Sequence, residues 1–202
     1  MHRRAWCGGL LLGLGLGQAL AASASPPVHE AVPPAPPLRI DTEHSHLGFE
    51  VRTRLGQHLE GVFPVYDGTV EALPDGRHQV RLRIATAAAE IPGRARYTAW
   101  MRGDSFFDSV RHPWMEFVSD PYVAAGLADG AALNGRLTLR GVTQDEALQV
   151  APSACPRPGL DCAVWVSGDI QRSRYGMDDW RLVLSDRVLL RMQVRLKENP
   201  PP

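Results

Sequence analysis

Residues 187–196 read Arg-Val-Leu-Leu-Arg-Met-Gln-Val-Arg-Leu, and an apolar side chain occupies every second position from Val188 to Leu196. Most of the positions between them are polar. Successive side chains of a β-strand point to opposite faces, so this stretch would have one apolar face and one mostly polar face. A period of two, in place of the 3.6 of a helix, predicts a strand that covers a core with one face.

The same alternation recurs along most of the chain. It is clear at 47–51, 80–84 and 133–139, and further strands fit around 59–72, 115–119, 145–150 and 163–172. Turn signals such as Pro74-Asp75-Gly76 and Ala128-Asp129-Gly130 separate them. About eight one-sided strands joined by short turns predict an all-β fold, an antiparallel sandwich or barrel. Residues 94–103 do not alternate and predict one short helical segment that carries Trp100 and Met101 over one end of the sheet.

The charges of the chain are balanced. It has 202 residues, with 22 Lys plus Arg against 22 Asp plus Glu. A nucleic-acid-binding protein usually carries a basic excess, so nucleic acid is not expected as a partner. Hydrophobic residues make up 44%, the level of an ordinary globular protein that buries a core. The length suits one domain.

The two ends of the chain lack the strand pattern. Residues 1–21 begin with Arg3 and Arg4, continue with an apolar run and end in Ala19-Leu20-Ala21, which predicts a secretory signal peptide. The alternative is a membrane anchor, but the apolar run is shorter than the roughly 18 residues that a spanning helix needs. Residues 22–37 hold six prolines and predict a disordered linker, which is either a tether or a stub without a role.

These boundaries leave 38–198 as the folding unit and 199–202 as a disordered tail. A cleaved signal peptide predicts an exported, periplasmic protein whose mature chain has no membrane-spanning segment. Removing residues 1–21 takes away Arg3 and Arg4 and no acid, so the mature chain would carry two more acidic than basic residues.

Two cysteines remain after the predicted cleavage. Cys155 and Cys162 lie in Cys-Pro-Arg-Pro-Gly-Leu-Asp-Cys. An oxidising compartment favours a disulfide between them, and closing so short a loop restricts the unfolded chain by roughly 2–3 kcal/mol. A redox role is the alternative, but the spacing is not that of a C-x-x-C motif. The sequence predicts a structural disulfide.

Residues that could carry catalysis or hold a metal ion are few. His44 and His46 share a face of a strand and could chelate a metal ion, with His58 or His112 as a third ligand. Leu47 and its alternating partners define the inward face of this strand, so we expect both histidines to point outward and predict no metal site. The sequence has no G-x-S-x-G elbow and no H-E-x-x-H motif. No catalytic residue is predicted, and the chain is not expected to be an enzyme.

The large apolar side chains outnumber what the alternation alone requires. Eight of them could share one interior: Phe49, Phe63, Trp100, Met101, Phe106, Phe107, Phe117 and Trp165. A small eight-stranded barrel can be filled by such side chains, or it can hold one small ligand. The pattern alone leaves a filled core and a ligand cavity equally open.

Seven short motifs follow one another through the predicted folding unit. They are Ile40-Asp41-x-x-His44-Ser45-x-x-x-Phe49, Gly61-x-Phe63, Asp67-Gly68-Thr69-Val70, Phe106-Phe107-Asp108 with His112-Pro113-x-x-x-Phe117, Gly135-x-Leu137-Thr138-Leu139-x-Gly141-Val142-Thr143, Arg172-Ser173-x-Tyr175-Gly176-Met177 and Ser185-Asp186-x-Val188. Each motif alone is weak, whereas the ordered set is specific. Through it, from about Arg39 to Leu196, the chain resembles the YceI-like family of exported bacterial proteins.

The resemblance implies an extended, lipocalin-like antiparallel β-barrel whose elongated apolar cavity binds an isoprenoid or quinone-type lipid, with no other cofactor required. The lipid tail is expected among Phe49, Val51, Phe63, Phe117, Leu137 and Leu139, and the entrance beside Trp100, Met101, Phe106 and Phe107. Arg172 and Tyr175 would support the polar head group, although Arg172 fits the role of a structural ion-pair partner equally well. Each buried CH₂ of such a tail contributes about 0.8 kcal/mol, so no catalytic group is needed to hold it.

The chain departs from the family pattern near the expected entrance. Thr98 and Trp100 stand where many relatives carry an Asp and a His, and Arg174 stands where many have an acid. The fold assignment does not depend on these positions. The head group of the ligand, however, cannot be carried over from the relatives.

Together these features predict a periplasmic carrier or sequestering protein for a long-chain isoprenoid, of polyprenyl or ubiquinone type, or a similar amphiphilic lipid. One alternative is an enzyme acting on a lipid-like molecule, which would need His44, Asp108, His112 and Arg172 to converge on the cavity. Another is a filled-core interaction module that meets a partner through its Pro-rich tether and its outer Arg-bearing face. The predicted partner is a hydrophobic small molecule, and homodimerisation is left open.

Overall fold

The computed structural model describes residues 36–127 and 129–199. They belong to one compact unit, Pro34–Pro202. The predicted signal peptide, residues 1–21, lies outside the described residues, as do most of the predicted linker 22–37 and residues 200–202 of the predicted tail. Within the described ranges, no helix has the length and apolar character needed to cross a bilayer.

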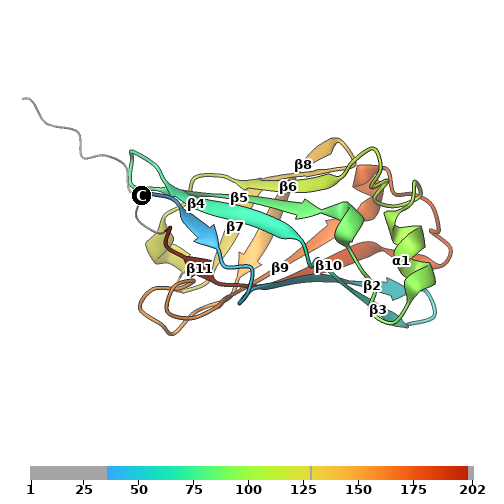
Figure 1. The fold of residues 1–202 in the computed structure, drawn as a ribbon, viewed down its shortest axis with the longest axis horizontal. Helices are drawn as coiled ribbons and strands as arrows, with labels where there is room; N and C mark the ends of the chain where they lie inside the picture. Colours follow the sequence, from blue (N-terminus) through green and yellow to red (C-terminus); the bar gives the residue numbers. More distant parts are fainter. Residues whose placement is uncertain (1–35, 128, 200–202) are drawn as a thin grey trace, which may run out of the picture. The chain divides into compact units, whose positions relative to one another are not determined.

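The described residues form one antiparallel sheet with an α-helix and three short 3₁₀-helices. The strands are β1 (Leu38–Ile40), β2 (His46–Thr53), β3 (His58–Val62), β4 (Tyr66–Ala72), β5 (His78–Ala85), β6 (Trp114–Ser119), β7 (Ala131–Leu139), β8 (Val142–Val150), β9 (Val164–Gln171), β10 (Leu184–Val194) and β11 (Leu196–Lys197). The helices are α1 (Ala95–Arg102), η1 (Thr86–Ala88), η2 (Ala124–Leu127) and η3 (Arg172–Tyr175). The order across the sheet is β11-β1-β4-β5-β6-β7-β8-β9-β10-β2-β3 (Figure 1).

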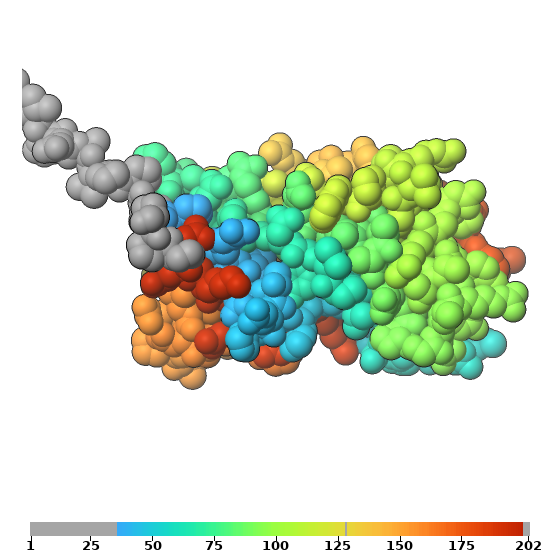
Figure 2. All heavy atoms as spheres, viewed as in Figure 1, coloured from blue at the N-terminus to red at the C-terminus, as the bar shows by residue number. Residues whose placement is uncertain are grey.

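The sheet curls on itself because the chain crosses between its two sides at Arg195. β10 pairs with β2 near one edge, whereas β11 pairs with β1 at the other edge. Ser45 holds this crossing, since its hydroxyl donates to the carbonyl oxygen of Arg195 and accepts from the Arg195 N–H group. Figure 2 shows β1 in blue and β11 in red meeting at one end of the unit. The fold is the lipocalin-like antiparallel barrel that the resemblance implies.

The structure has eleven strands where the sequence predicts about eight. The predicted strand at 59–72 is interrupted at Pro64, which has no N–H group for the ladder, and becomes β3 and β4. The predicted strand at 187–196 breaks at Arg195, where the chain crosses, and its last residues form β11. The remaining addition is β1, which has three residues and is too short to show an alternation.

The alternation predicts the faces of the strands correctly. Leu190 and Met192 of β10 are buried, and so are Leu133, Leu137 and Leu139 of β7. The arginines between them in the sequence point outward, where the guanidinium group stays in water.

The expectation that Trp165 lies in the interior is wrong. Its side chain is 59% exposed, while Val164 and Val166 pack against the core. Alternation along β9 therefore turns the indole outward, although a tryptophan is large enough to suggest a core position.

The helix occupies the predicted segment and lies across one end of the barrel (Figure 1). Thr98 ties it to the preceding loop, because its hydroxyl accepts from the N–H group of Ile91 at 2.9 Å. Arg102 donates from Nε to the carbonyl oxygen of Ala89 at 2.8 Å. Met101 is the buried residue of the helix.

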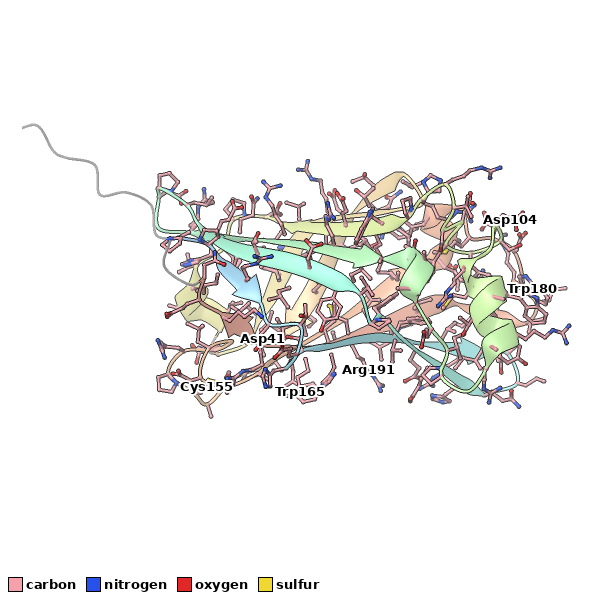
Figure 3. All side chains as sticks on the ribbon, viewed as in Figure 1. Asp41, Asp104, Cys155, Trp165, Trp180 and Arg191 are labelled. Carbon is pink, nitrogen blue, oxygen red and sulfur yellow. A yellow bond between two sulfur atoms is a disulfide. The ribbon has the colours of Figure 1, made fainter. Side chains whose placement is uncertain are left out.

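The predicted disulfide between Cys155 and Cys162 is present. It closes the loop that joins β8 to β9, at the end of the barrel opposite α1 (Figure 3).

Candidate functional site

A cavity of about 250 Å³ lies at the end of the barrel that α1 covers. Its wall combines residues of β2, β9 and β10 with residues of α1, of the loop after α1 and of the segment that follows η3. Apart from Thr53 and Arg172, every lining residue is apolar or aromatic. Such a space favours a hydrocarbon chain over water, because water would find too few hydrogen-bond partners there.

Most of the predicted site residues line this first cavity. They are Phe49, Val51, Phe63, Trp100, Met101, Phe106, Phe107, Leu139 and Arg172. Phe117, Leu137 and Tyr175 do not line it. Whether any of these side chains contacts a ligand stays a prediction.

Three phenylalanines from separate parts of the chain meet in the wall. The ring centroids of Phe49 and Phe63 are 5.2 Å apart, and Phe107 contacts both at 6.4 and 6.2 Å. These separations lie in the range of tilted and edge-to-face aromatic pairs. The trio joins β2, the residue after β3 and the loop after α1, and so fixes the loop against the barrel.

The mouth of the cavity is aromatic. The indoles of Trp100 and Trp180 stack with centroids 5.5 Å apart, and Tyr97 lies 5.5 Å from Trp100. All three are partly exposed, at 37–45%. Trp180 has a φ of 63°, a backbone conformation that is costly for a bulky residue. Contacts of the surrounding fold, such as the stacking on Trp100, hold Trp180 in this conformation beside α1 (Figure 3).

Arg172 lies beneath the mouth and is 2% exposed. Its Nε donates to the carbonyl oxygen of Ser185 at 3.0 Å, and its Nη1 donates to those of Met177 and Asp179. Arg172 does not take the alternative role of a structural ion-pair partner, because no carboxylate within the described residues forms an ion pair with it. Burial lowers the pKa of Arg172 from its ordinary value. Its Nη2 is buried without a hydrogen-bond partner among the described residues and is free to donate to a bound oxygen.

Tyr175 is not among the residues that line the first cavity. It is 1% exposed, and its hydroxyl donates to Oε1 of Glu146 at 2.8 Å. Arg174 donates to the same oxygen at 2.9 Å. Burial and the bond to Glu146 raise the pKa of the Tyr175 hydroxyl. The tyrosine therefore anchors η3 to β8.

Phe117 and Leu137 belong to a narrow waist deeper in the barrel. The space there is about 20 Å³, and Met115, Leu190 and Met192 line it with them. The resemblance implies one elongated cavity with both residues beside the lipid tail. In the structure, side chains from several strands narrow the interior to about 20 Å³ at this level.

A second apolar cavity of about 390 Å³ lies beyond the waist. Its wall includes Val80, Val166 and Val194, and residues 156–160 of the disulfide loop lie over it. His78, Tyr122 and Arg157 are the lining residues with polar side-chain groups, and burial raises the pKa of Tyr122 to about 12. The barrel interior thus consists of two apolar chambers, which contradicts a solid core.

Several lining residues were not predicted as site residues. Val188, Leu190 and Ile170 occupy inward positions of β10 and β9, so the alternation could have identified them. Trp180 and Val183 could not be found in this way, because they lie in the segment between η3 and β10, which has no alternating pattern. Its position depends on the bonds from Arg172.

The groups needed for the enzyme alternative do not converge. His44 pairs with Asp41 at the surface, at 2.7 Å, and Asp108 pairs with Arg111. His112 approaches Gly141 rather than either chamber. Only Arg172 of the proposed set lines the first cavity.

The histidines near the start of the domain point outward, as expected. Ligand atoms of Asp41, Glu43 and His44 lie within 4.8 Å of one another, whereas His46 is not part of this group. The hydrogen bond from His44 lowers the pKa of the Asp41 carboxyl, so the two side chains already satisfy each other.

The curled sheet and its apolar chambers define a barrel of the lipocalin-like class. The chain belongs to the YceI-like domain family, whose model matches residues 38–196.

Solved structures share this fold at low sequence identity. BcnA of Burkholderia cenocepacia gives a TM-score of 0.64 at 19% identity, over 79% of this chain and 99% of that chain. A polyisoprenoid binding domain from Saccharophagus degradans, implicated in plant cell wall breakdown, gives 0.60 at 17%, over 81% and 98%. The Campylobacter jejuni YCEI protein gives 0.53 at 18%, over 71% and 87%. No sequence among the curated proteins matches the chain.

Proposed function

We propose that this protein is a periplasmic carrier or sequestering protein that holds a long-chain isoprenoid, of polyprenyl or ubiquinone type, or a similar amphiphilic lipid. The observation that carries the proposal is the first cavity, about 250 Å³ of apolar and aromatic lining beneath an aromatic mouth. Membership of the YceI-like family supports it, as does the polyisoprenoid-binding description of the relative from Saccharophagus degradans.

The tail of the ligand would lie between the aromatic trio and the inward residues of β9 and β10. Each CH₂ removed from water there contributes about 0.8 kcal/mol, so a few isoprene units suffice for tight binding. A polar head group would remain at the mouth. Arg172 is the group suited to it, because its unpartnered Nη2 could donate to a carbonyl or hydroxyl oxygen of the ligand.

A longer tail would have to pass the waist and enter the second chamber. Met115 and Met192 line that passage, and methionine side chains change rotamer at low cost. We therefore expect short chains to occupy the first chamber alone and long chains to occupy both.

Extraction of the purified protein with organic solvent, followed by mass spectrometry, tests the proposal directly. A stoichiometric isoprenoid or quinone is the expected result. Titration of the delipidated protein with a ubiquinone-type quinone should quench tryptophan fluorescence to saturation, because Trp100 and Trp180 line the cavity.

Two alanine variants test whether the quenching reports binding in the cavity. Trp100→Ala should reduce both the quenching and the affinity, whereas Trp165→Ala removes an exposed indole outside the cavity and should change neither affinity nor saturation. Absence of a co-purified lipid together with absence of saturable uptake would refute the proposal. Cell fractionation and N-terminal sequencing of the mature chain test its export and the predicted cleavage of residues 1–21.

A further inference from the structure

The mouth of the first cavity is surrounded by apolar side chains that face solvent. We define the mouth surface as Leu55, Tyr97, Trp100, Trp180, Leu182 and Val183. Leu55 and Leu182 are 91% and 93% exposed, and Val183 is 48% exposed. Leu55 and Leu182 do not line the cavity, so its packing does not explain them. A contiguous exposed apolar patch of this kind marks a surface that meets another molecule or a membrane.

Three segments are joined to form this surface. The N–H group of Arg54 donates to the carbonyl oxygen of Val183 at 2.7 Å, and its Nε donates to that of Arg181 at 3.2 Å. These bonds tie the β2–β3 turn to the segment before β10. Stacking of Trp180 on Trp100 ties the same segment to α1. The mouth surface is therefore formed by three segments that contact one another, and not by the tip of a single loop.

Arginine side chains lie among the apolar side chains of the mouth surface. Arg94 and Arg96 lie over the rings of Tyr97 and Trp100, with Cζ 5.5 and 4.5 Å from the ring centroids. Neither forms an ion pair with any acid in the described part of the chain, and nor does Arg54.

Some of the acidic side chains at the α1 end of the barrel form ion pairs. Asp178 pairs with Arg181, and Glu90 lies 3.8 Å from Arg102, which leaves the exposed Asp104 and Asp179. The unpaired arginines lie beside the aromatic rings. Trp and Tyr side chains next to Arg are typical of protein surfaces that sit at the boundary between lipid head groups and acyl chains.

We propose that the mouth surface docks on a bilayer that contains anionic phospholipids. Leu55, Leu182 and the indole of Trp180 would enter the head-group region, and Arg54, Arg94 and Arg96 would contact lipid phosphates. Docking would place the mouth against the bilayer, so that a lipid moves between membrane and cavity without crossing water. The docking itself is independent of the proposed function, whereas this loading role rests on it.

Cosedimentation with vesicles tests the docking. Vesicles of phosphatidylcholine alone are compared with vesicles of phosphatidylcholine and phosphatidylglycerol. We expect the protein to bind both and to prefer the anionic ones. Leu55→Ser combined with Leu182→Ser should lower partitioning to both by roughly tenfold, because two leucines no longer leave water. Arg94→Gln combined with Arg96→Gln should lower binding to the anionic vesicles alone, by roughly fivefold per arginine.

Val123→Ser combined with Trp165→Ser is the matched control, since both residues are exposed, at 63% and 59%, and lie outside the mouth surface. It should partition like the unmodified protein. Equal partitioning of the leucine variant, or no binding of the unmodified protein to either vesicle, would overturn the docking. Dimerisation that the leucine changes abolish, with no vesicle binding, would show instead that the surface joins two copies of this chain.

A second measurement separates docking from ligand binding. The leucine variant should bind a quinone supplied in detergent with unchanged affinity, but it should take up quinone from vesicles several-fold more slowly. Equal uptake rates would contradict the loading role. Vesicle binding without any quinone binding would refute the proposed function and leave the docking intact.

Discussion

Arg172 is a single residue that satisfies several buried backbone groups. It is almost fully buried and bonds three carbonyl oxygens of the segment that shapes the mouth. Arg172→Met keeps the apolar stem but leaves these oxygens without donors. We expect the free energy of unfolding to fall by about 2–4 kcal/mol in urea denaturation.

Arg187→Met is the control for this change. Arg187 pairs with Asp169 on the exposed side of the sheet, and loss of such a surface ion pair should cost less than about 1 kcal/mol. Equal losses for the two variants would contradict the assigned role of Arg172.

Glu50 is a second residue whose burial has a measurable consequence. It points to the outer face, yet it is only 6% exposed because Arg52, His58 and Arg191 cover it. Burial alone would raise the pKa of this carboxyl, but the bond from Arg52 and the charges of Arg191 and His58 together hold it below its ordinary value of 4.5.

A carboxyl whose pKa is lowered by folding stabilises the folded state fully above its unfolded-state pKa. That stabilisation is lost as the pH falls from about 4.5 through the lower folded-state value. Glu50→Gln should therefore be less stable than the unmodified protein at pH 7, and the difference should shrink below pH 4.5. Urea denaturation over this pH range measures it. Glu60→Gln, at an exposed position of the neighbouring strand, should show no such convergence, and parallel curves for Glu50→Gln would rule out the linkage.

At the scale of elements, the loop between β8 and β9 depends on its disulfide. The bond closes a short loop that lies over the second chamber. Cys155→Ser combined with Cys162→Ser should lower the free energy of unfolding by about 2–3 kcal/mol, mainly because the unfolded chain regains freedom. The unmodified protein under reducing conditions should match the variant. A variant as stable as the oxidised protein would show that the loop needs no covalent closure.

The elements also show what the sequence could predict. The faces of β7 and β10 follow from alternation, because neighbouring side chains along one strand decide them. The helix and the disulfide follow from equally local signals. The outward turn of Trp165 also follows from alternation, because Val164 and Val166 on either side of it pack against the core.

The waist could not be predicted, because it depends on which residues of distant strands face each other at one level of the barrel. Phe117 of β6 meets Leu137 of β7 through their pairing, and Leu190 of β10 reaches the same level from the other side of the barrel. The place of the 177–183 segment has the same origin. No spacing in the sequence shows that Arg172 bonds the carbonyl oxygens of Met177 and Asp179.

At the scale of the whole molecule, the two chambers predict how affinity depends on ligand length. Val188 of β10 lines only the first chamber, and Val166 of β9 only the second. Val188→Trp should remove the binding of isoprenoid alcohols of every length, because it fills the chamber behind the mouth. Val166→Trp should leave farnesol binding unchanged but weaken a long polyprenol by at least about tenfold, since each excluded carbon loses about 0.8 kcal/mol. Calorimetric titration of both variants measures this, and thermal unfolding checks that each is folded. If Val166→Trp binds the long polyprenol as tightly as the unmodified protein does, the tail stops at the waist and the second chamber is not part of the lipid site.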